Sequence, residues 1–165
     1  MSDFAAIRQW LENTQDEPLE DMSGFFDRRV DTYEDHMRPW RDYYRWLGEL
    51  IPSQAETLLD LGCGWGALGG VLAKKYPGVR FVLTDVNERA AALAERNLKL
   101  NGLDNFEVVC GDGFAAVEGT FDWIVTNPPI RAGKQVIYGM FAQAAESLLP
   151  GGGLCLVCLL YTSPS

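Results

Sequence analysis

The sequence predicts an α/β protein with a Rossmann-like, doubly wound parallel sheet and an amino-terminal helical cap. Three observations support this fold class. Strand-like and helix-like stretches alternate from residue 57 onward, a glycine-rich turn follows the first strand-like stretch, and acidic or amide residues follow the later ones. Parallel strands need crossover connections, so this alternation is typical of a sheet with helices on both faces. The residues after the strands then meet at one edge of the sheet.

The first 50 residues predict the helical cap. They carry 12 acidic and 6 basic residues, a net charge of −6 in a chain whose total is −9. Aromatic residues recur there at helical spacing, which favours docking against the core, with a lid over the substrate as the alternative. The expected helices are residues 4–13, 22–36 and 39–50. We place the domains at 1–50 (cap), 51–160 (core) and 161–165 (a disordered or artefactual tail), with the boundary near Ile51-Pro52-Ser53.

The core elements follow in chain order. Apolar runs bounded by glycine, proline or asparagine predict strands at residues 57–61, 80–84, 106–110, 121–126 and 154–160. The segments between them predict helices at residues 67–76, 87–100 and 134–149. Asn87 is a good amino cap for the second core helix and Gly102 a good carboxyl cap. Glu95 and Lys99 are spaced to pair on the surface of that helix.

The turn after the first strand, Gly62-Cys63-Gly64-Trp65-Gly66, predicts a cofactor site. Glycines let a ligand approach the backbone, and the amino end of the following helix is electropositive. The second strand ends at Asp85, where an acid commonly binds ribose hydroxyls. After the third strand, Asp112 can accept a hydrogen bond from an adenine amino group. These three strand ends therefore favour a single bound adenosine.

The segment Asn127-Pro128-Pro129-Ile130 follows the fourth strand and predicts the reacting site. The Asn127 side-chain oxygen and the Pro128 carbonyl can accept hydrogen bonds from one amino group, while the prolines fix the backbone. An exocyclic amine is a poor nucleophile because its lone pair is conjugated, so positioning by two acceptors favours its alkylation. A plain turn after a strand is the alternative.

The spacing Gly64-x-Gly66-x-x-Gly69 also matches the dinucleotide fingerprint, which is a weak signal alone. A nicotinamide enzyme would use the later glycine for close helix packing and would need a hydride-transfer site, for which no candidate residue is evident. The glycine turn, Asp85, Asp112 and Asn127-Pro128-Pro129 instead resemble motifs of the class I S-adenosylmethionine-dependent methyltransferases.

Within that superfamily, residues 58–157 resemble the catalytic domain of the small-subunit ribosomal RNA guanine-N2 methyltransferases. The matches include Asp60-Leu61-Gly62-Cys63-Gly64, Asp85-Val86-Asn87, Asn97, Asn101-Gly102, Phe121-Asp122, Asn127-Pro128-Pro129, Gly133 and Gly151-Gly152-Gly153. The resemblance implies that S-adenosyl-L-methionine is the cofactor and that guanine in ribosomal RNA is the substrate.

The same resemblance implies roles for individual residues. Asn127, Pro128 and Pro129 are the expected catalytic residues, with Ile130 and Arg131 contacting the substrate. The glycines of the turn would line the methionine part of the cofactor, Asp85 would hold the ribose and Asp112 would face the adenine. The expected cofactor-binding set is Asp60, Gly62, Cys63, Gly64, Gly66, Asp85, Val86, Asp112, Gly113 and Asn127.

Two features favour other functions. Many amine-directed relatives carry an aromatic residue where this chain has Ile130, and an acidic cap repels phosphate. Both favour a small-molecule substrate as the runner-up to ribosomal RNA. The class I sheet has seven strands, of which five are readable here, so we expect a chain truncated at its carboxyl end. A non-catalytic cofactor-binding fragment is therefore the third hypothesis.

We expect no metal site. Cys155 and Cys158 lie three apart in a predicted strand and so face opposite sides, and the lone His36 lies in a polar helical stretch where a surface role is expected. Cys63 is expected to be a small neighbour of the cofactor and not a nucleophile. No apolar run approaches a membrane span and no secretion signal is evident, so we expect a cytoplasmic protein. The sequence predicts no oligomeric state.

Overall fold

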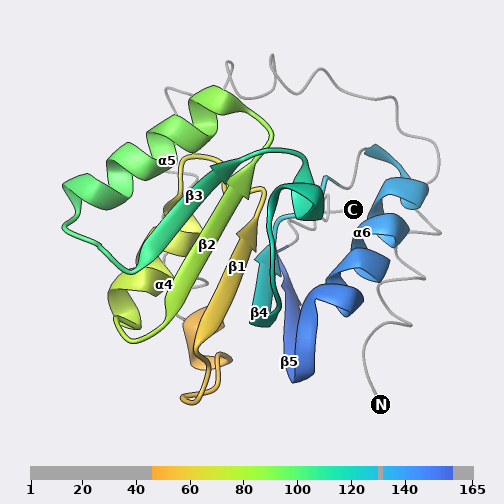
Figure 1. The fold of residues 1–165 in the computed structure, drawn as a ribbon, viewed down its shortest axis with the longest axis horizontal. Helices are drawn as coiled ribbons and strands as arrows, with labels where there is room; N and C mark the ends of the chain where they lie inside the picture. The colour runs from red at the N-terminus through yellow and green to blue at the C-terminus, as the bar shows by residue number, and fades with distance from the viewer. Residues whose placement is uncertain (1–45, 130–131, 158–165) are drawn as a thin grey trace, which may run out of the picture.

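The computed structural model describes residues 46–129 and 132–157, which form a five-stranded sheet flanked by helices (Figure 1). The strand order is β3-β2-β1-β4-β5, and every neighbouring pair is parallel. The order reverses between β1 and β4, which is the switch point of a doubly wound sheet. The predicted fold class is therefore confirmed.

The elements of the core alternate as the sequence predicts. In chain order they are β1 (Thr57–Leu61), α4 (Ala67–Lys75), β2 (Arg80–Asp85), α5 (Glu88–Leu100), β3 (Phe106–Cys110), the 3-10 helix η2 (Gly113–Ala116), β4 (Phe121–Thr126), α6 (Lys134–Ser147) and β5 (Leu148–Leu156). Local chemistry sets the ends of α5 as expected. The Asn87 side chain accepts hydrogen bonds from the amides of Arg89 and Ala90, and Gly102 follows the helix at φ 71°.

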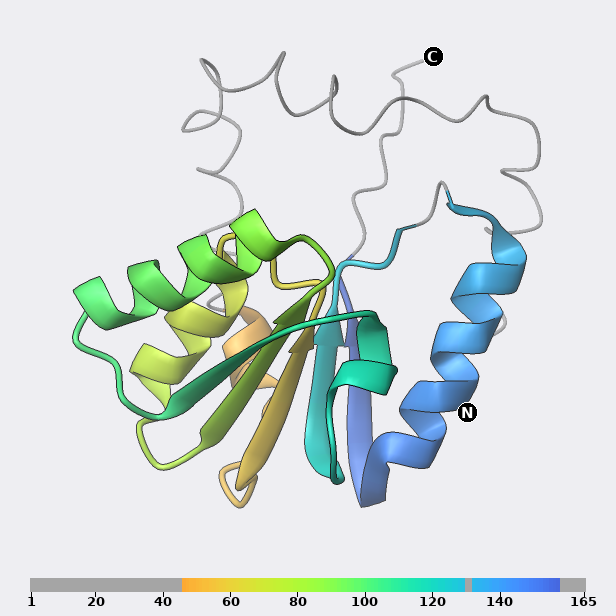
Figure 2. The ribbon, with the colours of Figure 1, turned by 45° about the horizontal axis from the view of Figure 1, so that its top comes forward.

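Helices cover both faces of the sheet (Figure 2). One face packs against α4 and α5, and its buried cluster includes Leu58, Leu72, Phe81 and Leu98. The opposite face packs against α6 and η2, around buried residues such as Leu59, Phe121 and Ala144. Burial on both faces explains why the strands read as continuous apolar runs instead of alternating patterns.

The segment before β1 contributes to the same core. Residues 46–49 are helical, Leu47 is fully buried and Ile51 is 5% exposed, both within the cluster on the α4 and α5 face. The Tyr76 hydroxyl at the end of α4 donates a hydrogen bond to the Gly48 carbonyl. Apolar packing against the sheet therefore begins before the predicted boundary at residues 51–53. The rest of the predicted cap lies outside the described residues.

The last strand differs from the prediction. The sequence predicts a helix to residue 149 and a strand at 154–160, whereas β5 begins at Leu148, directly after α6. Phe121 pairs with Leu148 and Trp123 with Gly153, so the Pro-Gly-Gly-Gly stretch is accommodated as an irregularity within the strand. Gly151, at φ 84°, permits this bulge. The glycines predict a turn because they break the apolar run.

Asp122, one of the residues of the family resemblance, lies at the opposite edge from the predicted site. Its Oδ2 accepts hydrogen bonds from the Glu56 and Thr57 amides, both at 2.9 Å, and from the Thr57 hydroxyl at 3.1 Å. These bonds, with the Glu56 amide as the main cause, lower the pKa of Asp122. Asp122 therefore joins the starts of β1 and β4.

None of the helices within the described ranges has the length and apolar character of a membrane span.

Candidate active site

The turn between β1 and α4, residues 62–66, is called the glycine loop below. Its first two amides, those of Gly62 and Cys63, both donate to the Thr84 carbonyl, at 2.8 and 2.9 Å. The Gly64 amide donates to Asp85 Oδ2 at 2.8 Å. The loop is thus attached to the end of β2, the neighbouring strand of the sheet. This attachment brings the glycine loop and Asp85 together, as predicted.

The backbone of the glycine loop needs glycine. Gly62, Gly64 and Gly66 have φ values of 73°, 56° and 83°, in the left-handed region that L side chains rarely adopt. A Cβ at Gly62 or Gly64 would have no atom of the described residues within 4 Å, whereas one at Gly66 would lie 2.7 Å from Leu98 Cδ1. Gly66 therefore packs against α5, while Gly62 and Gly64 open onto space that a cofactor can occupy.

Gly69, the third glycine of the dinucleotide-like spacing, is a packing residue in this fold as well. A Cβ there would lie 2.6 Å from Leu83 Cδ2 and 2.8 Å from Asp60 Oδ2. Its amide donates to the same Asp60 oxygen at 2.9 Å. Close approach of α4 to the sheet thus accounts for this glycine, and the spacing alone does not distinguish a dinucleotide site from other nucleotide sites.

Burial perturbs two ionisable groups beneath the glycine loop. Asp60 is 2% exposed, and burial raises its pKa to about 7; the hydrogen bond from Gly69 opposes this rise and the charge of Asp85 adds to it. Burial also raises the pKa of the Cys63 thiol, with further contributions from Asp60 and Asp85. The thiol therefore stays protonated at neutral pH, which excludes an activated cysteine nucleophile at this position.

Asp85 joins the glycine loop to α5. While Oδ2 accepts from Gly64, Oδ1 accepts from the Asn87 amide at 2.9 Å, immediately before the helix. A carboxylate can accept about four hydrogen bonds. After these two, lone pairs remain on both oxygens, so the residue can also accept from ribose hydroxyls. Val86 beside it is 71% exposed and offers an apolar surface to a planar base.

The end of β3 forms the third predicted part of the cofactor site. The Gly111 amide donates to the Asp85 carbonyl at 3.0 Å, which holds this turn against the end of β2. Asp112 is exposed, and Gly113 adopts φ 55°, where an added Cβ would have no described atom within 4 Å. The ends of β1, β2 and β3 thus supply glycines that open onto space and carboxylates, an arrangement that fits an adenosine-containing cofactor.

Residues 127–129, called the Asn-Pro-Pro segment below, begin at the end of β4, beside the glycine loop in the sheet. Thr126 pairs with Leu61, the residue before that loop, and its hydroxyl donates to the Leu61 carbonyl at 2.8 Å. On the other side, the Val157 amide donates to the Thr126 carbonyl at 2.8 Å. The segment therefore starts from a point fixed by both neighbouring strands.

Asn127 is exposed and Pro128 is buried. No described residue donates a hydrogen bond to the Asn127 side chain or to the Pro128 carbonyl, while the Pro129 carbonyl accepts from the Ala132 amide at 2.8 Å. Among the described residues, both acceptors of the predicted amine site therefore lack a hydrogen-bond partner. Ile130 and Arg131, the predicted substrate contacts, lie outside the described residues, as do His36 and Cys158.

Asn97 contacts the site, although sequence reasoning assigns it no role. Its side-chain amide donates to the Trp65 carbonyl in the glycine loop at 3.0 Å. Asn97 is among the residues that match the family, which is a sign of a role. Its position in the sequence does not reveal a contact with a residue 32 positions earlier. No group of three or more metal-binding side chains occurs in the ranges that the structure describes.

The stretch that carries this geometry matches a known protein family. Residues 45–160 match the family described as "Methyltransferase small domain". The chain is 42% identical over 108 residues to the uncharacterized protein YbxB of Bacillus subtilis, an alignment that covers 64% of this chain and 54% of that protein. It is 38% identical over 111 residues to ribosomal RNA small subunit methyltransferase C of Aeromonas hydrophila, covering 65% of this chain and 32% of that protein.

A solved structure of coclaurine N-methyltransferase, bound to N-methylheliamine and S-adenosylhomocysteine, superimposes with a TM-score of 0.60 at 26% identity. It matches 70% of this chain and 34% of that protein. The aligned part of the chain spans about half or a third of the length of the curated relatives. The family match, over residues 45–160, includes the described sheet and helices and the three predicted cofactor loops. The chain therefore belongs to the methyltransferase small domain family, within the S-adenosylmethionine-dependent methyltransferases.

Proposed function

We propose that this protein transfers a methyl group from S-adenosylmethionine to an exocyclic amino group, with guanine N2 of small-subunit ribosomal RNA as the substrate. The observation that carries the proposal is a pair of acceptors, Asn127 Oδ1 and the Pro128 carbonyl, that have no partner among the described residues and follow the strand paired with the start of the glycine loop. The name of the Aeromonas relative, a ribosomal RNA small subunit methyltransferase, supports the choice of substrate.

The residues of this chain fit the cofactor. Gly62 and Gly64 would lie along its methionine end, Asp85 would accept from the ribose hydroxyls, and Val86 and Asp112 would contact the adenine. When bound, the cofactor supplies an electrophilic methyl group on a sulfonium. The buried Asp60, which is charged at pH values above its raised pKa, lies close beneath the loop and favours a cationic ligand above it.

The Asn-Pro-Pro segment performs the second part of the reaction. Asn127 Oδ1 and the Pro128 carbonyl accept the two hydrogens of the amine, which orients the nitrogen lone pair and favours its pyramidal form. Methylation makes the amine nitrogen cationic, and the proton it then loses is one already hydrogen-bonded to one of these acceptors. Because the alkylated, cationic nitrogen is far more acidic than the neutral amine, water can take that proton and no strong base is required.

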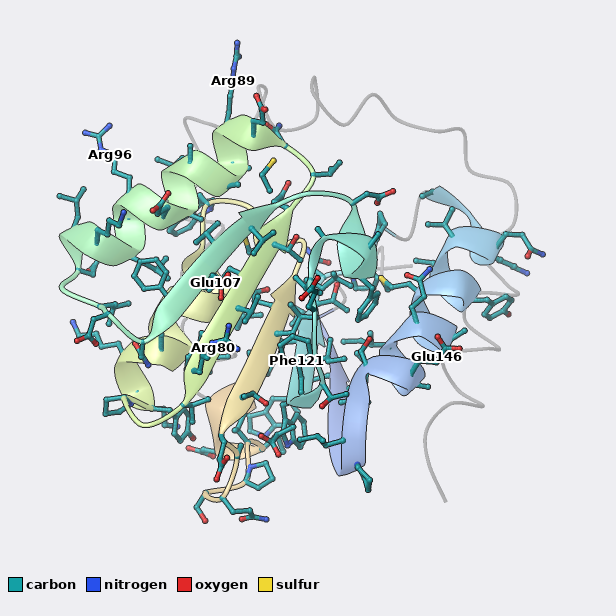
Figure 3. All side chains as sticks on the ribbon, in the orientation of Figure 1. Arg80, Arg89, Arg96, Glu107, Phe121 and Glu146 are labelled. Carbon is teal, nitrogen blue, oxygen red and sulfur yellow. The ribbon has the colours of Figure 1, made fainter. Side chains whose placement is uncertain are left out.

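Two arginines on α5 bear on the choice of substrate. Arg89 and Arg96 project away from the helix (Figure 3), and neither has an ion-pair partner among the described residues, whereas Arg80 is paired with Glu107 at 2.6 Å. Unpaired arginines can contact phosphates. Against this stands the net charge of −9, which favours a small molecule that carries an exocyclic amine as the second candidate substrate.

A transfer assay with methyl-labelled cofactor distinguishes these candidates. The proposal predicts label in bulk ribosomal RNA that lacks the modification, recovered after digestion as N2-methylguanine. Label in a metabolite extract, with none in RNA, would establish the small-molecule candidate instead. Binding of S-adenosylhomocysteine without transfer to either would identify a non-catalytic cofactor-binding protein.

A further inference from the structure

α5 forms a platform under the glycine loop. A Cβ on Gly66 would lie 2.7 Å from Leu98 Cδ1 and 3.1 Å from Ala94 Cβ, so the loop backbone rests directly on these two side chains. Asn97 lies between them in sequence, and its Nδ2 donates to the Trp65 carbonyl at 3.0 Å. Positions 94, 97 and 98 share one helix face by the i, i+3, i+4 rule. One face of α5 thus combines two apolar contacts with one directional bond.

The hydrogen bond from Asn97 holds the peptide between Trp65 and Gly66. This peptide connects Gly64, whose amide binds Asp85, to Gly66, which packs against α5. Glycines flank Trp65 on both sides and impose little rotational restraint. The amide of the same peptide donates to the Cys63 carbonyl at 2.9 Å within the loop. Loss of the Asn97 donor therefore removes a hydrogen bond between this turn and α5, which lets the turn shift relative to the helix. Such a shift would move the Gly64 amide away from the Asp85 carboxylate.

We infer that Asn97 is a positioning residue for cofactor binding, acting through the Trp65 peptide on the glycine loop. This inference rests on the proposed function for its ligand, but its geometric basis does not. Asn97 itself is half-buried on α5 and contacts the loop through its side-chain amide. Its effect should therefore appear in cofactor affinity and in loop dynamics, and not in the methyl-transfer step at the Asn-Pro-Pro segment.

Asn101 provides a matched control. It lies one turn further along the chain from Asn97, is exposed, and its side-chain amide donates to the Asn97 carbonyl at 2.8 Å, at the carboxyl end of α5. Asn101→Ala removes an asparagine hydrogen bond from the same helix without touching the loop. It reports the purely structural cost of such a change, a small decrease in Tm without a change in binding.

The test compares Asn97→Asp, Asn97→Ala and Asn101→Ala in the 165-residue chain. Asn97→Asp keeps the size of the side chain but replaces the donor with an acceptor. We expect the Kd for S-adenosylhomocysteine by calorimetry, well below Tm, to rise about five- to tenfold in both Asn97 variants and less than about twofold in Asn101→Ala. The KM for the methyl donor should rise equally while kcat changes less than about twofold. Unchanged affinity in a folded Asn97 variant would overturn the inference.

Amide hydrogen exchange separates failure of this inference from failure of the proposed function. By NMR, exchange of the Gly64 and Gly66 amides should accelerate at least about fivefold in Asn97→Asp and remain unchanged in Asn101→Ala, with no ligand present. If the wild-type chain bound no S-adenosylhomocysteine, the proposed function would fail while this exchange result still decided the role of Asn97. Equal exchange rates in wild type, Asn97→Asp and Asn101→Ala would contradict the proposed role of Asn97. If Asn97→Ala does not fold, Asn97→Asp alone carries both measurements.

Discussion

The glycine loop and the Asn-Pro-Pro segment differ in how many of their hydrogen-bonding groups find partners within the fold. Hydrogen bonds to two other elements hold the glycine loop. Its amides donate to Thr84 and Asp85 at the end of β2, and Asn97 of α5 donates to its Trp65 carbonyl. In contrast, the Asn-Pro-Pro segment is fixed where it leaves β4, and the acceptors on Asn127 and Pro128 have no partner among the described residues. Under the proposed roles, folding positions the cofactor side in advance and leaves the acceptors of the substrate side available for recognition.

The comparison predicts its largest effect at Asn127. Asn127→Ala removes one of the two acceptors for the amine without disturbing the loop that we assign to the cofactor. We expect kcat for methyl transfer to fall about 10²- to 10³-fold, the range for loss of one preorganised polar group at a reacting centre. Because Asn127 is also expected to border the cofactor, the Kd for S-adenosylhomocysteine should rise by up to about tenfold, far less than kcat falls. Transfer at the wild-type rate by this variant would refute the assignment of Asn127.

The next largest effect is expected at Asp85, where substitution removes hydrogen bonds that hold the glycine loop. Asp85→Ala removes the acceptor of the Gly64 and Asn87 amides as well as the proposed ribose contact. Hydrogen bonds to charged groups contribute about 1.5–3 kcal/mol each, so we expect the Kd for S-adenosylhomocysteine to rise at least about 30-fold. Calorimetry measures this directly. Equal affinities for the variant and wild type would show that the ribose lies elsewhere.

Two adjacent glycines of α4 test the close packing beneath the loop. In Gly69→Ala the new methyl would lie 2.6 Å from Leu83 and 2.8 Å from Asp60, whereas in Gly70→Ala it would lie 3.6 Å from Leu98. Overpacking should lower the free energy of unfolding of Gly69→Ala by about 1–3 kcal/mol. Gly70→Ala, the matched control, should be unchanged or more stable by up to about 1 kcal/mol. Urea denaturation measures both, and equal stabilities would contradict this account of Gly69.

Asp60 predicts an effect that depends on pH and reaches its full size only above neutral pH. Its carboxyl ionises near pH 3.8 in the unfolded chain and near pH 7 in the folded one, because burial raises the pKa by disfavouring the charge. Between these values the folded state holds a proton that the unfolded state has lost, so stability falls as pH rises from about 4 and the full cost is present above about 7. Asp60→Asn removes the charge and keeps an acceptor for the Gly69 amide.

At about 1.4 kcal/mol for each pKa unit, we therefore expect Asp60→Asn to exceed wild type in free energy of unfolding by about 3–5 kcal/mol at about pH 8, without added cofactor. The difference should shrink toward zero near pH 4, as measured by denaturant titration across this range. A variant that is less stable than wild type at the higher pH would show that the carboxylate is stabilised by groups other than Gly69.

Residue type and required backbone conformation coincide in the core elements and in the turns after β1, β2 and β3, which is why the sequence predicts their structure; their role in cofactor binding stays a prediction. Asn87 caps α5, and glycines occupy the positive-φ positions of the loop. The sequence places β5 too late because the bulge at Gly151 depends on pairing with β4, which no local pattern reveals. The contact from Asn97 to Trp65 and the structural position of Asp122 were not predictable for the same reason: both join segments far apart in the chain.

The most direct test of the central claim is an NMR titration of the nitrogen-15-labelled chain with S-adenosylhomocysteine. If the ends of β1, β2, β3 and β4 form one site, the amides of Gly64, Asp85 and Gly113 and the side-chain amide of Asn127 should shift together, with a single Kd. Shifts confined to the outer surfaces of α4 and α5, or saturation of Asn127 at a different concentration from Gly64, would contradict a common site.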